Sequence, residues 1–203
     1  MSKPPAKRHK ESDRYADQLT GPVKARYLEK IKLCGGVDPY SVSTWSVDDG
    51  RLPSLGYKDI VEYLMLKKSP YTREAFKAIK SLGAHNQVTS GWVKDVLSWS
   101  NRNPSHQGAT PANTCVTGKV YHSQRLSDPP EQPWVIVSHD GEILTAHCRC
   151  QAGLGETCSH VAALLFTVEA TVRIRDSTTV TQKPAYWNMP NFKEVAYLPA
   201  HKR

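Results

Sequence analysis

The sequence lacks any apolar run close to the roughly 18 residues that are needed to cross a bilayer. Its N-terminus, MSKPPAKRHKESDR, also lacks the apolar core of a secretory signal peptide. Both absences predict an intracellular protein without membrane contact. Cysteine is scarce as well, with five residues in 203. In a reducing compartment, cysteines are metal ligands or buried core residues more often than disulfides.

The sequence also lacks a constellation of residues that would support catalysis. The nearest approach is Cys158 with His160, as a nucleophile and a base. Two residues at positions i and i+2 near a helix start do not face each other, and no third orienting group accompanies them. We therefore expect a protein that is not an enzyme.

Positive charge is in excess, with a formal net charge of +8. Residues 1–33 hold nine Lys or Arg against four acidic residues, and residues 56–103 hold eight against four. Residues 140–176 hold three basic residues against five acidic ones. The charge predicts an anionic partner such as nucleic acid for the whole chain, but not for its cysteine-rich region.

Both ends of the chain are predicted to be irregular. Residues 1–20 are polar, basic and free of apolar periodicity, which predicts a disordered tail, and residues 177–203 are predicted to form an irregular C-terminal tail. The run KRHK at residues 7–10 resembles a nuclear localisation signal, although a solvated tail with no such role can have the same composition. Nuclear localisation is therefore one interpretation of this run.

Residues 21–90 are predicted to be mostly helical, with a turn-rich linker over residues 37–56. One helix is predicted over residues 24–33, with Leu28 and Ile31 on its apolar face, and another begins at Tyr57.

A further helix is predicted from Thr72, as its cap, to Gly83, with Phe76, Ile79 and Leu82 in an apolar line. Its opposite side would present a basic stripe that either contacts phosphate or is simply solvated. This stripe consists of Arg73, Lys77 and Lys80.

From residue 91 the periodicity changes towards two, which is typical of strands. The short segments GWVKDVL, CVTGKVYHSQ, PWVIVS and EILTAHC are rich in β-branched and aromatic residues, and turn residues separate them. They predict a small antiparallel sheet that leads directly into the cysteines. The expected class is therefore α+β, with a helical N-terminal half and, over residues 91–176, the sheet followed by the cysteine-rich segment, whose core is at residues 140–176.

The segment AHCRCQAGLGETCSHVAALLF at residues 146–166 holds three of the five cysteines. On a strand, Cys148 and Cys150 would point to the same face. Two glycines let the chain reverse before Cys158 and His160, which would lie in the first turn of a helix capped by Thr157. That helix has an apolar stripe of Val161, Leu164, Leu165, Val168 and Val172.

Three thiolates and an imidazole are suited to tetrahedral Zn²⁺. Four protein ligands leave no position for an activated water, which favours one structural zinc over a catalytic one. A disulfide between Cys148 and Cys150 would instead close a strained ring. Cys34 and Cys115 lack partners at ligand spacing and are expected to be buried in the core.

The pattern C-x-C, seven residues, C-x-H, between a predicted strand and an amphipathic helix, resembles the SWIM-type zinc finger. The resemblance implies a ββα arrangement with Cys148, Cys150, Cys158 and His160 as the ligands. A wider likeness covers residues 26–197 and links the chain to animal proteins in which a SWIM finger often precedes a nuclease domain similar to the YqaJ viral recombinase. It rests on the segments GKVYHSQR, PWVIV, TAHCRCQAGLGETCSHVAALLF and VRIRDSTTVTQKPAYW. Because this chain ends at Arg203 without such a domain, nuclease activity is not expected.

Two functions fit these observations. The first is a non-enzymatic module that binds DNA or another nucleic acid, with the zinc holding the fold together and the basic tail and the helical segment contacting phosphate. Arg173 and Arg175 could contact phosphate at the end of the last helix, or equally cap that helix with positive charge. The second is a protein–protein adaptor, since SWIM fingers are generally inferred to bind DNA or protein. The resemblance adds a third, the targeting part of a longer recombinase or nuclease polypeptide. Trp92, Trp99, Trp134 and Trp187 could stack on bases where they are exposed, or pack in the core.

Overall fold

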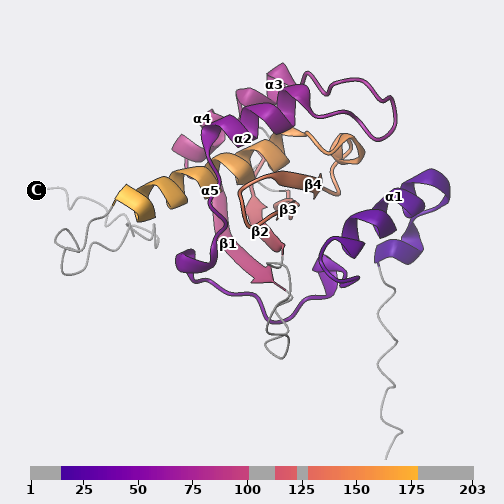
Figure 1. The fold of residues 1–203 in the computed structure, drawn as a ribbon, viewed down its shortest axis with the longest axis horizontal. Helices are drawn as coiled ribbons and strands as arrows, with labels where there is room; N and C mark the ends of the chain where they lie inside the picture. Colours follow the sequence, from indigo (N-terminus) through magenta and orange to yellow (C-terminus); the bar gives the residue numbers. More distant parts are fainter. Residues whose placement is uncertain (1–14, 101–112, 123–127, 178–203) are drawn as a thin grey trace, which may run out of the picture.

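The computed structural model describes residues 15–100, 113–122 and 128–177 (Figure 1). The strands are β1 (Val93–Ser100), β2 (Thr114–Val120), β3 (Trp134–Val137) and β4 (Ile143–His147), and the α-helices are α1 (Gly21–Lys32), α2 (Tyr57–Val61), α3 (Ile79–Leu82), α4 (His85–Thr89) and α5 (Ser159–Ser177). A π-helix, η4 (Glu62–Leu66), continues α2, and 3-10 helices form η1 (Tyr15–Gln18), η2 (Pro39–Ser41), η3 (Asp49–Arg51) and η5 (Gly153–Gly155). In the part of the chain that the structure describes, no helix is both long and apolar enough to span a membrane.

The four strands form one antiparallel sheet in the order β1-β2-β3-β4. The predicted α+β class is confirmed. Alternate residues of the central strands enter two separate hydrophobic clusters: Val135 and Val137 of β3 face one, whereas Trp134 and Ile136 face the other. All four are fully buried, so the sheet is covered on both faces at β3.

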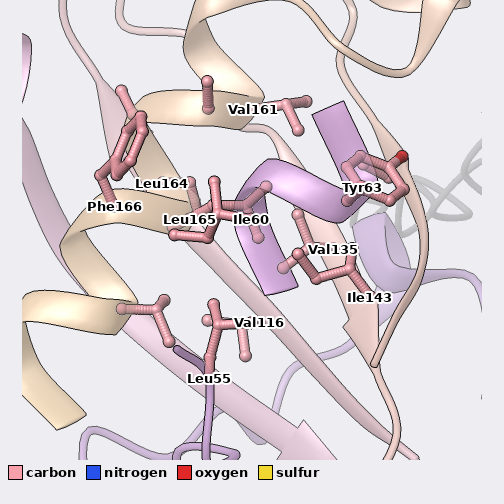
Figure 2. Close-up of a cluster of buried hydrophobic side chains, with 14 of the residues drawn as sticks. Leu55, Ile60, Tyr63, Val116, Val135, Ile143, Val161, Leu164, Leu165 and Phe166 are labelled. Atoms are coloured by element: carbon pink, nitrogen blue, oxygen red, sulfur yellow. The ribbon is translucent and has the colours of Figure 1, made fainter. Parts of the chain in front are cut away.

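Helix α5 covers one face of the sheet. Leu164, Leu165 and Val161 pack against Val116 and Val135 of the central strands, as Figure 2 shows. The predicted apolar stripe of α5 is confirmed, since all five of its residues are buried. The opposite side of the helix is buried too in its first two turns, because α2, α3 and α4 pack along it (Figure 1).

Helix α1 and the segment before it cover the other face. Tyr27 and Ile31 of α1 pack in one cluster with Trp134 and Ile136 of β3. Tyr15 joins them, with its ring centroid 5.0 Å from that of Tyr27. The prediction that residues 1–20 form a disordered tail is therefore wrong for residues 15–20, because aromatic packing holds this segment on the sheet. The remainder of both predicted tails, residues 1–14 and 178–203, lies outside the described residues.

The predicted helix from Thr72 to Gly83 is wrong for most of its length. Only Ile79–Leu82 is helical, as α3. Before it, the chain runs back along the end of η4, because the amide of Phe76 donates to the carbonyl of Lys67 at 2.9 Å and the amide of Ala78 donates to that of Leu64 at 2.9 Å. These long-range backbone bonds outweigh local helix propensity.

The basic stripe predicted on that helix does not form. Arg73 and Lys77 have left-handed backbone conformations with φ of 64° and 48°, which a continuous α-helix excludes. Lys80 lies on α3. Although all three side chains are exposed, they do not share one helix face.

The predicted apolar face of α1 is also only partly correct. Ile31 is buried as expected, but Leu28 is 38% exposed and Lys30 is buried instead. The position of Lys30 is explained by an acidic partner near the cysteines, described below.

Candidate metal centre

Four side chains from two turns converge at one end of the sheet. Cys148 directly follows β4, and Cys150 lies in the turn after it. Cys158 directly precedes α5, and His160 lies in the first turn of that helix. One ligand atom from each of the four side chains lies within 4.8 Å of the others, so the group could hold a metal ion.

The turn after β4 positions the first two sulfurs. The sequence predicted a strand that continues through Cys150, but β4 ends at His147. The amide of Cys150 then donates to the Cys148 sulfur at 3.5 Å. The chain turns so tightly here that a Cβ on Gly153 would lie 1.9 Å from the carbonyl oxygen of Cys148. Only glycine fits this close approach.

The start of α5 positions the other two ligands. The carbonyl of Cys158 accepts the amide of Ala162 at 3.1 Å, so Cys158 is the residue at the helix cap. The predicted cap, Thr157, instead donates its hydroxyl to the carbonyl of Gly155. Free amides at a helix start favour negative charge on a nearby sulfur, so the helix favours thiolate ligands at this end.

With protons rather than a cation between them, the four groups share charge unequally. Hydrogen bonds from Cys148 and Cys158 hold the pKa of the Cys150 thiol far below its usual range, and the pKa of Cys148 is raised. Burial disfavours the charged form of His160, but hydrogen bonds and charge from Cys150 and Cys158 outweigh it and raise its pKa to about 10. Negative and positive charge thus meet in the cluster, and a bound cation would displace protons from it.

Two further side chains touch the ligands. The ring of His122 stands edge-on to that of His160 at 5.2 Å between centroids. A carboxylate oxygen of Glu131 lies 3.9 Å from the Cys148 sulfur. His122 is therefore in contact with one of the four candidate ligands. His139 is exposed in the turn between β3 and β4.

His147 and Arg149, the two neighbours of Cys148 in the chain, point away from the ligands. His147 is buried beside Tyr27, and its Nε2 lies 3.0 Å from the Tyr15 hydroxyl. Burial lowers the pKa of His147 to about 3, so the ring stays neutral. Arg149 is exposed, and its guanidinium carbon lies 3.8 Å from the centre of the Tyr40 ring.

A buried charge cluster ties the turn between the ligands to α1. Glu156 is 1% exposed and accepts from Arg26 Nε at 2.8 Å, while Lys30 Nζ lies 2.9 Å from the same carboxylate oxygen. Thr145 of β4 donates to the other oxygen at 2.8 Å. Burial raises the pKa of Glu156, but the hydrogen bond from Arg26 and both positive charges outweigh it and hold the pKa below its usual value.

This cluster was not predicted from the sequence, because its partners are 130 residues apart. One signal was available: Lys30 follows Tyr27 by three residues and precedes Ile31, which places a charge on the apolar face of α1. A charge in such a position requires a buried partner.

The basic residues predicted to contact nucleic acid have different surroundings. Arg175 donates to the backbone carbonyls of Asp49 and Leu52 at 3.1 and 2.9 Å, so it fastens the end of α5 to the chain before α2. Arg173 is exposed and paired with Glu169 at 3.3 Å. The structure brings the four predicted metal ligands together but does not gather the five predicted basic residues on one element.

The charge of the chain is divided unevenly. The described residues hold 16 of the 27 Lys and Arg residues and 16 of the 19 Asp and Glu residues. They are therefore neutral in sum. The net charge of +8 lies entirely in residues 1–14, 101–112, 123–127 and 178–203.

Trp45 is a functional candidate that the sequence did not single out, and it is half-buried at the rim of a groove. Trp134, in contrast, is completely buried, and Cys34 and Cys115 are buried as predicted. Trp187 lies outside the described residues.

Comparisons of the chain with models of known protein families, with curated proteins and with solved structures found no match.

Proposed function

We propose that the chain is a SWIM-type module that binds one structural zinc ion through Cys148, Cys150, Cys158 and His160. The convergence of three sulfurs and one imidazole within 4.8 Å carries this proposal. Zinc accepts this donor set in tetrahedral geometry, and four protein ligands complete its coordination. The ion would join the end of β4 to the start of α5 and so stabilise the packing of the helix on the sheet.

Metal analysis of the purified chain tests the zinc site. We expect one zinc per chain, and we expect Cys158→Ser to lose the metal together with the fold around residues 140–176. Cys34→Ser is the matched control, because Cys34 is buried in the other hydrophobic cluster, which contains none of the four candidate ligands. Its thiol donates hydrogen bonds to the carbonyls of Ile31 and Val37. A zinc content near zero after chelator-free, anaerobic preparation contradicts the proposal.

We further propose that the module is not an enzyme and binds DNA or another nucleic acid. The distribution of charge supports this function, because the described residues are neutral and 11 Lys and Arg residues against 3 acidic ones lie outside them. Basic segments of this kind release counterions from phosphate when they bind nucleic acid. A nuclear location would be consistent with this role.

A salt titration of oligonucleotide binding tests the nucleic-acid function. We expect the logarithm of the binding constant to fall steeply and linearly with the logarithm of the salt concentration. Binding that is absent at low salt, or that does not depend on salt, contradicts it.

The alternative function is a protein–protein adaptor. It is favoured by four exposed apolar or aromatic side chains on and after α2: Tyr57, Leu66, Tyr71 and Ile79. Such exposure marks interaction surfaces when the side chains are contiguous. A chain that binds zinc but no oligonucleotide would support this function. The role of a targeting part in a longer recombinase or nuclease rests on the sequence resemblance alone.

A further inference from the structure

A groove of about 450 Å³ lies between the segment around η2 and the β1–β2 part of the sheet. It lies on the face opposite α5, because Thr117 and Lys119 alternate with Val116 and Val120, which pack towards α5. Helix α1 covers a neighbouring part of this face, through the cluster around Trp134. The volume is in the range of pockets that hold small ligands.

The walls of the groove are aromatic and apolar. They include Tyr40, Trp45, Leu97 and Trp134. The indole N–H of Trp134 is buried and has no acceptor among the described residues. A buried donor without a partner is uncommon in folded proteins.

A cation stands against Tyr40, one of the residues that line the groove. Arg149 stacks on the Tyr40 ring at 3.8 Å and also lies 4.6 Å from the centre of the Tyr15 ring. The two rings meet at 68°, so they hold the exposed guanidinium in a corner. A fixed guanidinium offers its planar fork of donors to phosphate or to a base edge.

Another wall of the groove is formed by β1 and β2. Lys119 and Lys94 are opposite each other in the strand register. Lys119 is paired with Asp95 at 2.7 Å, where β1 bulges, and the ammonium of Lys94 lies 5.3 Å from the centre of the Tyr121 ring. Asp95, which lines the groove, is thus neutralised by Lys119.

We propose that this groove binds single-stranded nucleic acid, with Trp45 and Tyr40 stacking on unpaired bases and Arg149, Lys94 and Lys119 contacting phosphate. The inference rests on the proposed nucleic-acid function and assigns it a site and a strand form. Aromatic rings flanked by basic side chains are the common means of holding single strands, because every base has a face for stacking. In a duplex those faces are covered by neighbouring bases, so the groove selects single strands.

Charge complementarity supports this occupant. Lys119 lines the groove in a pair with Asp95, and two exposed cations border it: Arg149 on the Tyr40 ring and Lys94 opposite Lys119. The described residues as a whole are neutral in sum. Residues 1–14, which hold five Lys or Arg against two acidic residues, directly precede Tyr15 in the chain. Tyr15 contacts both Arg149 and Tyr40, so the most basic segment of the chain joins the folded part beside the groove.

Fluorescence anisotropy with the full zinc-loaded chain tests the proposal. The probes are a labelled thymidine oligonucleotide of about 12 nucleotides and a duplex of the same length. We expect tighter binding of the single strand, and we expect Trp45→Ala and Arg149→Ala each to weaken it about tenfold, which is within the range for losing one base–aromatic stack. Trp45→Phe should retain most of the binding, and Arg149→Lys should lose part of it, because lysine keeps the charge but not the stacked plane.

Tyr71→Ala and Lys58→Ala are the matched controls, since they remove an exposed aromatic ring and an exposed charge that do not line the groove. Zinc content and circular dichroism establish that each variant is folded. Oligonucleotide binding that is unchanged in both groove variants would overturn the groove and leave the nucleic-acid function to the basic segments. Tighter binding of the duplex would overturn the single-strand assignment.

Two other results separate the remaining possibilities. If the native chain binds no oligonucleotide at low salt, the proposed function fails and the groove assignment fails with it. In the other result, a polyglutamate peptide changes the tryptophan fluorescence of the native chain but not that of Trp45→Ala, while the oligonucleotide changes neither. In that case the groove binds an acidic protein segment, and our assignment is overturned.

Discussion

Glu156 is the residue on which the candidate metal centre and α1 both depend. It lies between the second and third ligands, in a left-handed backbone conformation with φ of 64°. Its carboxylate is shared by Arg26 and Lys30, and its carbonyl accepts the Tyr63 hydroxyl at 3.1 Å. A single side chain therefore compensates two buried or half-buried cations and fixes the turn that carries the ligands.

We predict that Glu156→Gln destabilises the zinc-loaded chain by about 3 kcal/mol, because removing one partner of a buried ion pair leaves uncompensated charge. Urea denaturation followed by circular dichroism measures the loss. Glu29→Gln is the control, since Glu29 pairs with the same Arg26 but is 64% exposed, and exposed pairs contribute less than about 1 kcal/mol. Equal effects of the two substitutions would contradict a buried role for Glu156.

The same residue predicts a dependence of stability on pH. The pKa of Glu156 is lower in the folded chain than its ordinary value of 4.5. A carboxyl group of this kind stabilises the fold above the unfolded pKa and loses that contribution as the pH falls through the folded value. The stability difference between the native chain and Glu156→Gln should therefore be constant from neutral pH down to about 5 and shrink below 4.5. A difference that grows on acidification would contradict this sign.

At the scale of elements, the turn between β4 and α5 decides the metal geometry. We predict that Gly153→Ala lowers zinc affinity at least about tenfold, comparable to other losses of support around a metal site. The added methyl group would collide with the carbonyl of Cys148. Gly155→Ala is the matched control, because nothing lies within 4 Å of its added Cβ. Competition with a chromophoric zinc chelator measures both affinities, and similar values for the two variants would argue against the close approach.

The sequence was most informative where an element's own residues decide its packing. The β-branched and aromatic residues of PWVIVS predicted a strand that proved to be buried on both faces, and the stripe from Val161 to Val172 predicted the face of α5. Spacing and donor type identified all four residues of the cluster that could hold a metal ion. Each of these patterns is local, so it can be interpreted from its own segment without knowledge of the rest of the chain.

Prediction failed where distant residues outweigh local preference. Residues 72–78 have a helical pattern, but backbone bonds to residues 64–69 hold them in an extended return. The ammonium groups of Lys30 and Lys67 donate to the carbonyls of Ala146 and Ile143, which protects the open edge of β4. Neither arrangement leaves a pattern in the sequence, because the partners lie in another element.

At the scale of the whole molecule, the net positive charge lies outside the residues that the structure describes. The described residues are neutral in sum, and residues 1–14 and 178–203 hold nine Lys or Arg against three acidic residues. We predict that removing both terminal segments abolishes most of the salt dependence of oligonucleotide binding, since that dependence scales with the number of phosphates neutralised. Zinc content should be unchanged. An unaltered salt slope would show that the folded part provides the phosphate contacts.

The contact between Arg26 and Glu156 has a consequence for the order in which the chain is assembled during synthesis. The two residues are 130 positions apart, so at ribosomal rates α1 waits about 7–25 s for its acidic partner. Until then Arg26 and Lys30 have no acidic partner in the cluster, and the strands that α1 packs against are incomplete. Although α1 leaves the ribosome early, it is therefore among the last elements to dock. By then the ribosome is synthesising the segment that carries the candidate metal ligands.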